Sequence, residues 1–580
     1  MSSMLYQARG FLAAPSPVIG LCATRFQALG NPSFSSFVVN FVASFVDSLL
    51  PWHFISTNLT TKLATKGGGA AVSGRVLSAT LFEKGLTVVA MAALAAFTPS
   101  SVRAAGPAPA VEADTALVQV MVTSQEVDPL EPWQPRQPGS RTGYGVFVGS
   151  NLVITTENLV RNQRVVQIRL PQRGERIRAR VTNSDCQVNL ALLRIADGDV
   201  PAGVVPLALC DTVSRDSHLD IMQVDETTRV QHGIGRLFQV NMVPLPHAPN
   251  AALTFSLLSD FNITGDGVPV LLDGRLAGLI MSYNWGTRTG NVIPAITLRQ
   301  FTESSAASPY AGFASAGFMW AELVDPAKRK YLQVQGRTGG IVVVLCLPRS
   351  GAAASLRPQD VIIEWDGHPI DNLGFYQDSE FGRILFSCLV MNRRRPGDRI
   401  PVRIVRAGTE QTVEITLTRY EDGNAFVPEN PTRMPPEYLI EGGLILRELD
   451  AVYLRTLTER QRQGDSRLTN VYIERGADPR NPGDHVVILA SVLPDPINLG
   501  YQTFRDDIVT QVNGTTVHNM ADVFRIADRD GGVFKVMLQG FGVELVLDRN
   551  ELSAANARIS RSYRIPALRY QRKDDGRNGG

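Results

Sequence analysis

The chain has little net charge, few cysteines and no sustained apolar run. Lys+Arg 57 nearly balances Asp+Glu 55, which leaves a formal net charge of +2, so no global basic field argues for a nucleic-acid partner. The short run Arg393–Arg395 is typical of a solvated loop. The five cysteines, at positions 22, 186, 210, 346 and 388, show neither C-x-x-C spacing nor the density of a disulfide framework. We therefore expect no metal and no cofactor, and the pairing of Cys186 with Cys210 stays open.

No run reaches the roughly 20 apolar residues that a membrane span needs. A shorter apolar run at 86–97 follows Lys84 and precedes small residues around Arg103 and Ala104. This pattern predicts a secretory signal at about 84–104, cleaved near Ala104, and hence an extracytoplasmic, periplasmic protein. An uncleaved membrane anchor is the alternative. Residues 1–80 carry few charges, and our hypothesis is that they are an over-extended reading frame, so that 1–104 is an N-terminal extension rather than a domain.

The remainder is long enough for roughly three domains. Short runs with alternating or β-prone residues recur between polar turns, at 117–123, 165–170, 177–181 and 190–195. Another, at 143–160, reads as a hairpin whose second strand leads into a loop. Many short strands with turn signals predict an all-β barrel or sandwich.

Three stretches of the sequence resemble the HtrA/Deg branch of trypsin-like serine proteases. Residues 154–160 keep the frame of the family's L-T-N-A-H-V-V but place Asn158 where the His stands. Residues 181–195 resemble the stretch ending in D-L-A-L-L-K-V, with Asn189 for the Asp, and residues 262–269 resemble N-P-G-N-S-G-G-P, with Asp266 for the Ser. The resemblance spans about 117–301 and implies a trypsin-like double β-barrel, which we assign to residues 105–305.

All three catalytic roles are thus replaced at frame-matched positions. An amide cannot stabilise an imidazolium as a carboxylate does, and a carboxylate at 266 would repel the oxyanion. No His occurs between Gly143 and Ser217, so no small shift of the alignment restores the base. The resemblance therefore predicts a pseudoprotease with no intact catalytic residues. The alternative is a serine endopeptidase that uses displaced residues, for which the nearest candidates are His218, His232, His247, Ser256 and Ser259.

After a Ser/Ala/Gly linker, residues 313–420 resemble an HtrA-type PDZ domain through P-x-S-A-A-like, L-x-P-x-D-V-I-like and D-G-x-P-I motifs. Such a domain captures an extended C-terminus by strand addition. We predict that the strand at 341–345 borders this groove and that backbone N–H groups near 331–334 hold the carboxylate. The predicted peptide-binding residues are Tyr331, Leu332, Gln333, Val334, Ile341 and Val343. A groove blocked by the chain itself is the alternative.

Residues 438–552 resemble the divergent second PDZ domain of plant-type Deg proteins, because Y-x-x-x-G-G, N-x-G-Y and V-N-G follow in that order. Residues 553–580 would then be a C-terminal tail. The expected fold class is mainly β, a trypsin-like double β-barrel followed by two PDZ domains. The resemblance further implies a homo-oligomer, a trimer or a multiple of one, with PDZ domains outward on linkers near Ser304 and Pro431. Expected partners are unfolded polypeptides or protein C-termini and an active paralogue, but no nucleic acid.

Overall fold

The computed structural model describes residues 113–171, 173–245, 251–430, 434–457, 467–529, 531–540 and 542–572. The predicted signal and extension, together with His247 and Pro431, lie outside these residues. Contacts divide the chain into one unit at 1–108 and another at 109–580, and all described residues belong to the second. No helix among the described residues is long and apolar enough to cross a bilayer.

The first barrel closes with six strands in the order β1-β2-β3-β6-β5-β4, and each neighbouring pair is antiparallel. Alternation decides which face of a strand enters the core: in β5, Ile177 and Ala179 are buried whereas Arg178 and Arg180 are exposed. The strands are β1 (Leu117–Ser124), β2 (Gly139–Phe147), β3 (Leu152–Thr155), β4 (Gln163–Arg169), β5 (Ile177–Asp185) and β6 (Leu190–Ile195).

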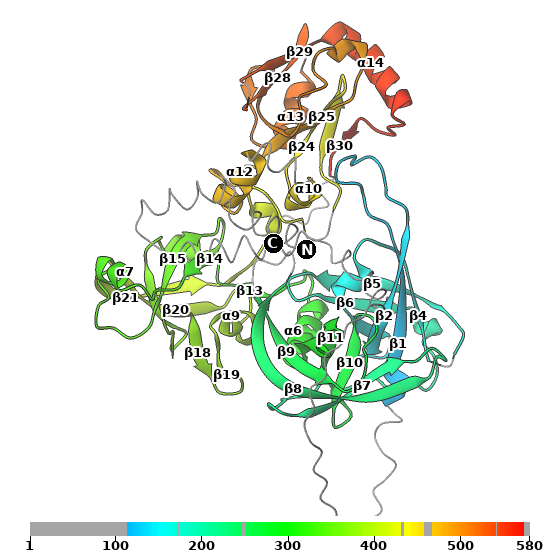
Figure 1. Cartoon of the computed structure of the whole chain (residues 1–580), viewed down its shortest axis with the longest axis vertical. Coiled ribbons are helices and arrows are strands. Elements are labelled where there is room, and N and C mark those ends of the chain that lie inside the picture. Colours follow the sequence, from blue (N-terminus) through cyan, green and yellow to red (C-terminus); the bar gives the residue numbers. More distant parts are fainter. Residues whose placement is uncertain are drawn as a thin grey trace, which may run out of the picture. The chain divides into compact units, whose positions relative to one another are not determined.

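The second barrel also closes with six strands, in the order β10-β11-β12-β9-β8-β7. Its longest strand, β8, curves along one side of the barrel in Figure 1. The strands are β7 (His218–Val224), β8 (Val230–Pro244), β9 (Ala251–Ser259), β10 (Val268–Leu272), β11 (Arg275–Asn284) and β12 (Thr289–Pro294). The prediction of a mainly β, double-barrel protein is therefore confirmed.

Two helices complete the barrel region. The short helix α5 (Glu157–Val160) follows β3, and α6 (Ala295–Ala306) follows β12 directly. Ser304 lies in α6 and is 6% exposed, so the predicted linker at this position is wrong: the helix continues to Ala306, and Ser304 follows Leu298 and Phe301 on its buried face.

The region predicted to be the first PDZ domain, for which we keep that name, contains a PDZ-like sheet in the order β14-β15-β16-β20-β21, with β17 paired to β16. The short strands β13 (Ala314–Ser315) and β22 (Thr418–Arg419) pair where the chain enters and leaves the domain. The other elements are β14 (Phe318–Ala321), α7 (Pro326–Tyr331), β15 (Ile341–Cys346), α8 (Gly351–Ser355), β16 (Val361–Trp365), β17 (His368–Pro369), β18 (Phe375–Asp378), β19 (Gly382–Leu385), α9 (Ser387–Arg393), β20 (Arg399–Arg406) and β21 (Thr409–Thr416).

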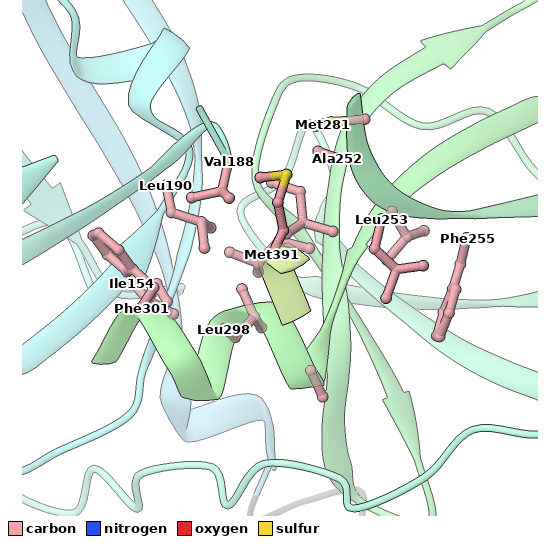
Figure 2. Close-up of a cluster of buried hydrophobic side chains, with 14 of the residues drawn as sticks. Ile154, Val188, Leu190, Ala252, Leu253, Phe255, Met281, Leu298, Phe301 and Met391 are labelled. Atoms are coloured by element: carbon pink, nitrogen blue, oxygen red, sulfur yellow. The ribbon is translucent and has the colours of Figure 1, made fainter. Parts of the chain in front are cut away.

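This domain does not hang from a free linker, because its core is continuous with that of the barrels. In Figure 2, Met391 of α9 lies between Val188 and Leu190 of the first barrel and Ala252 and Leu253 of the second. Hydrogen bonds accompany the apolar contact: the Asn392 amide donates to the Thr297 hydroxyl at 3.0 Å. Arg395 pairs with Glu303 at 2.9 Å. Shared apolar burial of this kind holds two domains in one arrangement.

The second PDZ domain is built on a sheet in the order β29-β28-β26-β25-β24-β23-β30. The helix α14 crosses residue 552 and β30 pairs with β23, so the chain as far as Tyr570 belongs to this domain and is not a tail. The elements are β23 (Tyr438–Glu441), β24 (Leu444–Glu448), α10 (Ala451–Thr456), α12 (Arg467–Arg475), β25 (Val487–Val492), β26 (Asp507–Val512), β27 (Thr515–Thr516), α13 (Met520–Ala527), β28 (Val533–Leu538), β29 (Glu544–Asp548), α14 (Arg549–Ser562) and β30 (Arg569–Tyr570).

Candidate functional site

Three polar residues from distant parts of the barrel region meet at one place. Asn158 lies in α5, Asn189 stands immediately before β6, and Asp266 lies in the loop before β10 between two glycines. The loop needs those glycines: Gly267 has φ +80°, and a Cβ on it would come within 2.2 Å of the Tyr144 carbonyl oxygen. The structure thus brings together the three residues that the sequence singled out.

Hydrogen bonds connect the three residues directly. The Asn158 side-chain amide donates to Asp266 Oδ2 at 3.1 Å, and the Asn158 backbone N–H donates to Asn189 Oδ1 at 2.8 Å. Backbone hydrogen bonds hold the surrounding segments in place. The Glu157 N–H donates to the Asn189 carbonyl oxygen, and the Tyr144 N–H donates to the Asp266 carbonyl oxygen. The polar groups therefore satisfy one another rather than facing an empty cleft.

Burial raises the pKa of the Asp266 carboxyl above its ordinary value, while the hydrogen bond from Asn158 and the nearby Arg141 guanidinium act in the opposite direction. Arg141 also donates to the Asn158 carbonyl oxygen at 3.0 Å and to Glu126 at 3.2 Å. Neither an amide nor a carboxylate can serve as the hydroxyl nucleophile of acyl transfer, and neither Asn158 nor Asn189 can take a proton at neutral pH. The three positions therefore hold no imidazole and no serine.

The displaced His and Ser residues are engaged elsewhere. Both ring nitrogens of His232 lie 2.9 Å from carboxylates, Nδ1 from Asp220 and Nε2 from Asp114, so neither is left to activate a hydroxyl. The Ser256 hydroxyl lies 3.3 Å from the Asn291 side-chain oxygen, and that of Ser259 donates to the Phe261 carbonyl oxygen at 2.8 Å. None of these contacts joins a Ser to a His.

The described residues contain no group of three or more His, Cys, Asp or Glu side chains that could hold a metal ion. Cys186 and Cys210 are both free thiols in the structure. Burial raises the pKa of the Cys186 thiol to about 12, which leaves it protonated and unreactive at neutral pH.

Two site residues had no sequence signal. Gln223 on β7 donates to the Asn262 carbonyl oxygen at 3.0 Å and accepts from the Thr264 N–H at 3.0 Å, so it braces the loop that carries Asp266. Arg141 on β2 reaches the same loop region through Asn158. A single Gln or Arg on a strand carries no motif, and only the closure of the barrels reveals these contacts.

The six predicted peptide-binding residues occupy two different places. Tyr331 ends the helix α7, and the N–H groups of Leu332, Gln333 and Val334 already donate to carbonyl oxygens within the same turn. They are therefore not available for a carboxylate. Ile341 and Val343 lie in β15, which pairs with β14 on one side and β16 on the other, so β15 has no edge to which a peptide could add.

The free edge belongs to β14 instead. This strand ends the sheet, and no described strand pairs with its other side. Trp320 of β14 meets Phe386 edge-on with ring centroids 5.6 Å apart, and Phe318 stacks on Phe386 at 6.1 Å. Phe386 immediately precedes α9. Phe318 and Phe386 are buried in the core, at 7% and 1% exposed, and of the three rings that of Trp320 alone is partly exposed.

The second PDZ domain has a similar strand order. β24, which follows the Gly442-Gly443 turn, pairs with β25 on one side and with β23 on the other, as β15 pairs with β16 and β14. The counterpart of β14 is therefore β23. The outer side of β23 is covered in part by β30, which pairs with Tyr438 and Leu439.

Comparison with known proteins agrees with this architecture. A PDZ-domain family profile matches residues 427–571. Two curated proteins of Arabidopsis thaliana are similar over most of the chain. "Putative protease Do-like 3, mitochondrial" is 24% identical over 456 residues, which cover 78% of this chain and 78% of that protein. "Protease Do-like 2, chloroplastic" is 25% identical over 470 residues, which cover 78% and 74%.

Among solved structures, "HtrA-type protease AlgW with tripeptide" is 18% identical with a TM-score of 0.42, and the match covers 55% of this chain and 99% of that one. The chain is thus similar to HtrA/Deg trypsin-like serine proteases that carry PDZ domains.

Proposed function

We propose that this chain is a non-catalytic HtrA/Deg-like protein that binds polypeptides or their C-termini and acts as a scaffold, chaperone or regulator in protein quality control. The observation that carries the proposal is the hydrogen bond between the Asn158 amide and the Asp266 carboxylate. It occupies the space in which a catalytic base and its serine would have to meet.

The chemistry supports this role. Removing a serine–histidine–aspartate triad lowers turnover by roughly 10⁶-fold, because the three groups act as one unit. Here all three side chains differ, and the Asp266 carboxylate adds negative charge where an oxyanion would develop. Similarity to proteases therefore supports a shared fold and ancestry more than a shared reaction.

Polypeptide binding would use the free edge of β14. Backbone groups on an edge strand pair with any extended chain, and neighbouring side chains select its residues. The partly exposed ring of Trp320, which packs on Phe386, favours a hydrophobic residue beside that edge. Such a site buries little area, so we expect micromolar affinity, raised by avidity if the chain assembles.

One experiment separates catalysis from binding. The full chain is incubated with a fluorophosphonate probe and with casein, and is titrated with a peptide that ends in hydrophobic residues. We expect no labelling and no turnover, but saturable binding that is lost when the backbone amides of the peptide are N-methylated. Labelling of a serine in the untouched chain would establish the alternative, a serine endopeptidase that uses displaced residues.

Assembly and location complete the proposal. We propose a homo-oligomer, a trimer or a multiple of one, with an active paralogue as a further partner; light scattering of the full chain tests the former. We propose secretion with cleavage near Ala104, so that the mature protein lies outside the cytoplasm. The relatives named above are mitochondrial and chloroplastic, and residues 1–80 hold a single acidic residue, Asp47, which also fits an organelle transit peptide. N-terminal sequencing and fractionation decide between the two.

A further inference from the structure

One stretch of the first barrel is strongly basic. Between residues 163 and 194 there are seven arginines and two acidic residues, a net charge of +5. Since the whole chain carries +2, everything outside this stretch carries −3 (+2 less +5). Of the two acidic residues, Asp185 is 3% exposed and faces the interior, where it accepts a hydrogen bond from Tyr310. It does not neutralise the surface.

Six of these arginines are exposed, and none of the ion pairs among the described residues involves them. We call them the arginine face. The nearby Arg161, by contrast, is tied to Glu157 by an ion pair at 2.5 Å. The members of the arginine face are Arg164, Arg173, Arg176, Arg178, Arg180 and Arg194.

The register of the strands shows why this arrangement needs an explanation. Arg180 of β5 stands directly opposite Arg194 of β6, and like charges at directly opposed positions destabilise a sheet. Arg178 lies two residues from Arg180 on the same outward side, opposite Gln167 of β4. No carboxylate occupies an exposed outward position on these three strands. The strands therefore offer Arg178, Arg180 and Arg194 no compensating carboxylate. The exposed acid of the stretch, Glu175, lies in the loop between Arg173 and Arg176, and Arg173 also donates to the Ala202 carbonyl oxygen at 3.2 Å.

We propose that the arginine face is a docking surface for acidic segments of polypeptides. Two residues along a strand span about 7 Å, so Arg178 and Arg180 repeat at the spacing of alternate residues in an extended peptide. Guanidinium groups bind carboxylates through two parallel hydrogen bonds, and every member of the face is an arginine. The choice of a polypeptide ligand rests on the proposed function; the charge pattern does not.

Other anionic partners fit less well. The outward residues of β4, β5 and β6 include no aromatic side chain, so bases of a single-stranded nucleic acid would find nothing to stack on. A strand surface in a closed barrel offers no helix to enter a groove of a duplex. Val165, 39% exposed, is the one large apolar residue exposed on these strands, which gives a membrane no apolar anchor.

The proposal is tested by titrating a fluorescently labelled peptide of Glu–Ser repeats with the full chain and measuring the fluorescence anisotropy. The repeat places a carboxylate at every second residue. A Gln–Ser repeat is the control for charge. We expect saturable binding of the first peptide alone, lost in 1 M salt, where the screening length falls to about 3 Å. The variant Arg180→Glu should weaken binding by about tenfold or more.

This variant also guards against a folding artefact. Arg180→Glu places a carboxylate opposite Arg194 and should therefore keep or raise the melting temperature. The matched control is Arg236→Glu on β8 of the second barrel, an exposed arginine without an ion pair among the described residues; it makes the same change in net charge and should leave binding unchanged.

Equal weakening by both variants would overturn the proposal, as would binding that Arg180→Glu leaves intact. Tighter binding to duplex DNA or to phosphatidylglycerol vesicles than to the Glu–Ser peptide would assign the face to another partner. The affinity for the hydrophobic C-terminal peptide at β14 should be the same in Arg180→Glu as in the unchanged chain. The arginine face and the proposed PDZ function can therefore fail independently.

Discussion

The polar cluster of Asn158, Asn189 and Asp266 and the edge at β14 differ in how they use their polar groups. In the cluster, Asn158 donates to the Asn189 side-chain oxygen and to the Asp266 carboxylate. Along β14, one side of the backbone faces no described strand. Paired polar groups stabilise one another, whereas an unpaired strand edge is a template for another chain. The difference supports the proposed polypeptide-binding role.

The second PDZ domain sharpens the contrast. Its β24 has β23 beside it in an antiparallel hairpin, with Tyr438 opposite Arg447 and Glu441 opposite Leu444. The Tyr438 ring also meets Trp133 of the barrel region at 6.2 Å, and Arg447 donates to the Pro129 carbonyl oxygen. The strand β23, the counterpart of β14, is thus paired with β24 and, at Tyr438 and Leu439, with β30. The outer side of β14, by contrast, faces no described strand.

The largest effect should come from restoring the three triad side chains. Asn158→His, Asn189→Asp and Asp266→Ser together replace the paired groups by a base, its orienting carboxylate and a nucleophile. Because triad members act as a unit, the triple variant should exceed any single reversion in casein turnover by about 100-fold or more. Asn158→His with Asn189→Asp and Asp266→Ala is the matched control. A triple variant no faster than this control would show that the surrounding loops, and not only the triad, have lost the reaction.

Breaking the edge should have the next largest effect. Trp320 is half-buried against Phe386, and its ring lies over Gly374, so Trp320→Ala should destabilise the domain by about 2 kcal/mol, less than for a fully buried aromatic. It should also weaken binding of a hydrophobic C-terminal peptide. Calorimetry measures both. Trp285→Ala, at a site 58% exposed on the second barrel, is the control and should change neither; unaltered peptide binding in Trp320→Ala would remove the β14 edge from the proposal.

The stability contributed by the polar cluster of Asn158, Asn189 and Asp266 should depend on pH, and that contributed by the β14 edge should not. Burial raises the pKa of the Asp266 carboxyl in the folded chain. Its contribution to the stability of the fold is therefore present at low pH, where the carboxyl is protonated in the folded and the unfolded chain, and is lost as pH rises through the folded-state pKa. Asp266→Asn should therefore stabilise the chain at neutral pH by about 1 kcal/mol at most. The gain should disappear in acid. Urea unfolding at several pH values measures it, and a gain that persists below the carboxyl range would contradict the assignment.

A smaller effect of the same kind is expected at His232. Its carboxylate partners Asp220 and Asp114 outweigh desolvation and raise the pKa of the imidazole. A raised pKa gives stability that is complete below the ordinary histidine value and lost as pH rises through the folded-state pKa. His232→Gln should flatten this part of the pH profile, with a small change because the group is partly exposed. NMR titration of the ring would contradict the prediction by showing an ordinary or lowered pKa.

Regular patterns made much of the architecture predictable. The alternating and apolar runs at 117–123 and 190–195 correspond to β1 and β6, because burial on a strand repeats every second residue. The glycine-framed loop marked Asp266, and frame-matched motifs marked Asn158 and Asn189. The structure then placed these three in contact. Local pattern and loop chemistry are both written in neighbouring residues, which is why they could be read.

The peptide site could not be located in this way. Residues 331–334 carry the right kind of motif, but their N–H groups close the turn that ends α7, and β15 is interior because β14, twenty residues earlier, pairs with it. Whether a strand is an edge depends on every other strand of the sheet. No single segment contains that information.

The sequence by itself determined the mainly β class, the strand positions of the barrels and the identity of the three substituted residues, because each depends on local periodicity or on the side chain present. Only the tertiary structure decided that Asn158 and Asp266 pair, that β14 rather than β15 has the free edge, and that Met391 joins the first PDZ domain to the barrels. These features arise where segments far apart in the chain meet. Their geometry is set by the packing of the whole unit, which no short stretch of residues specifies.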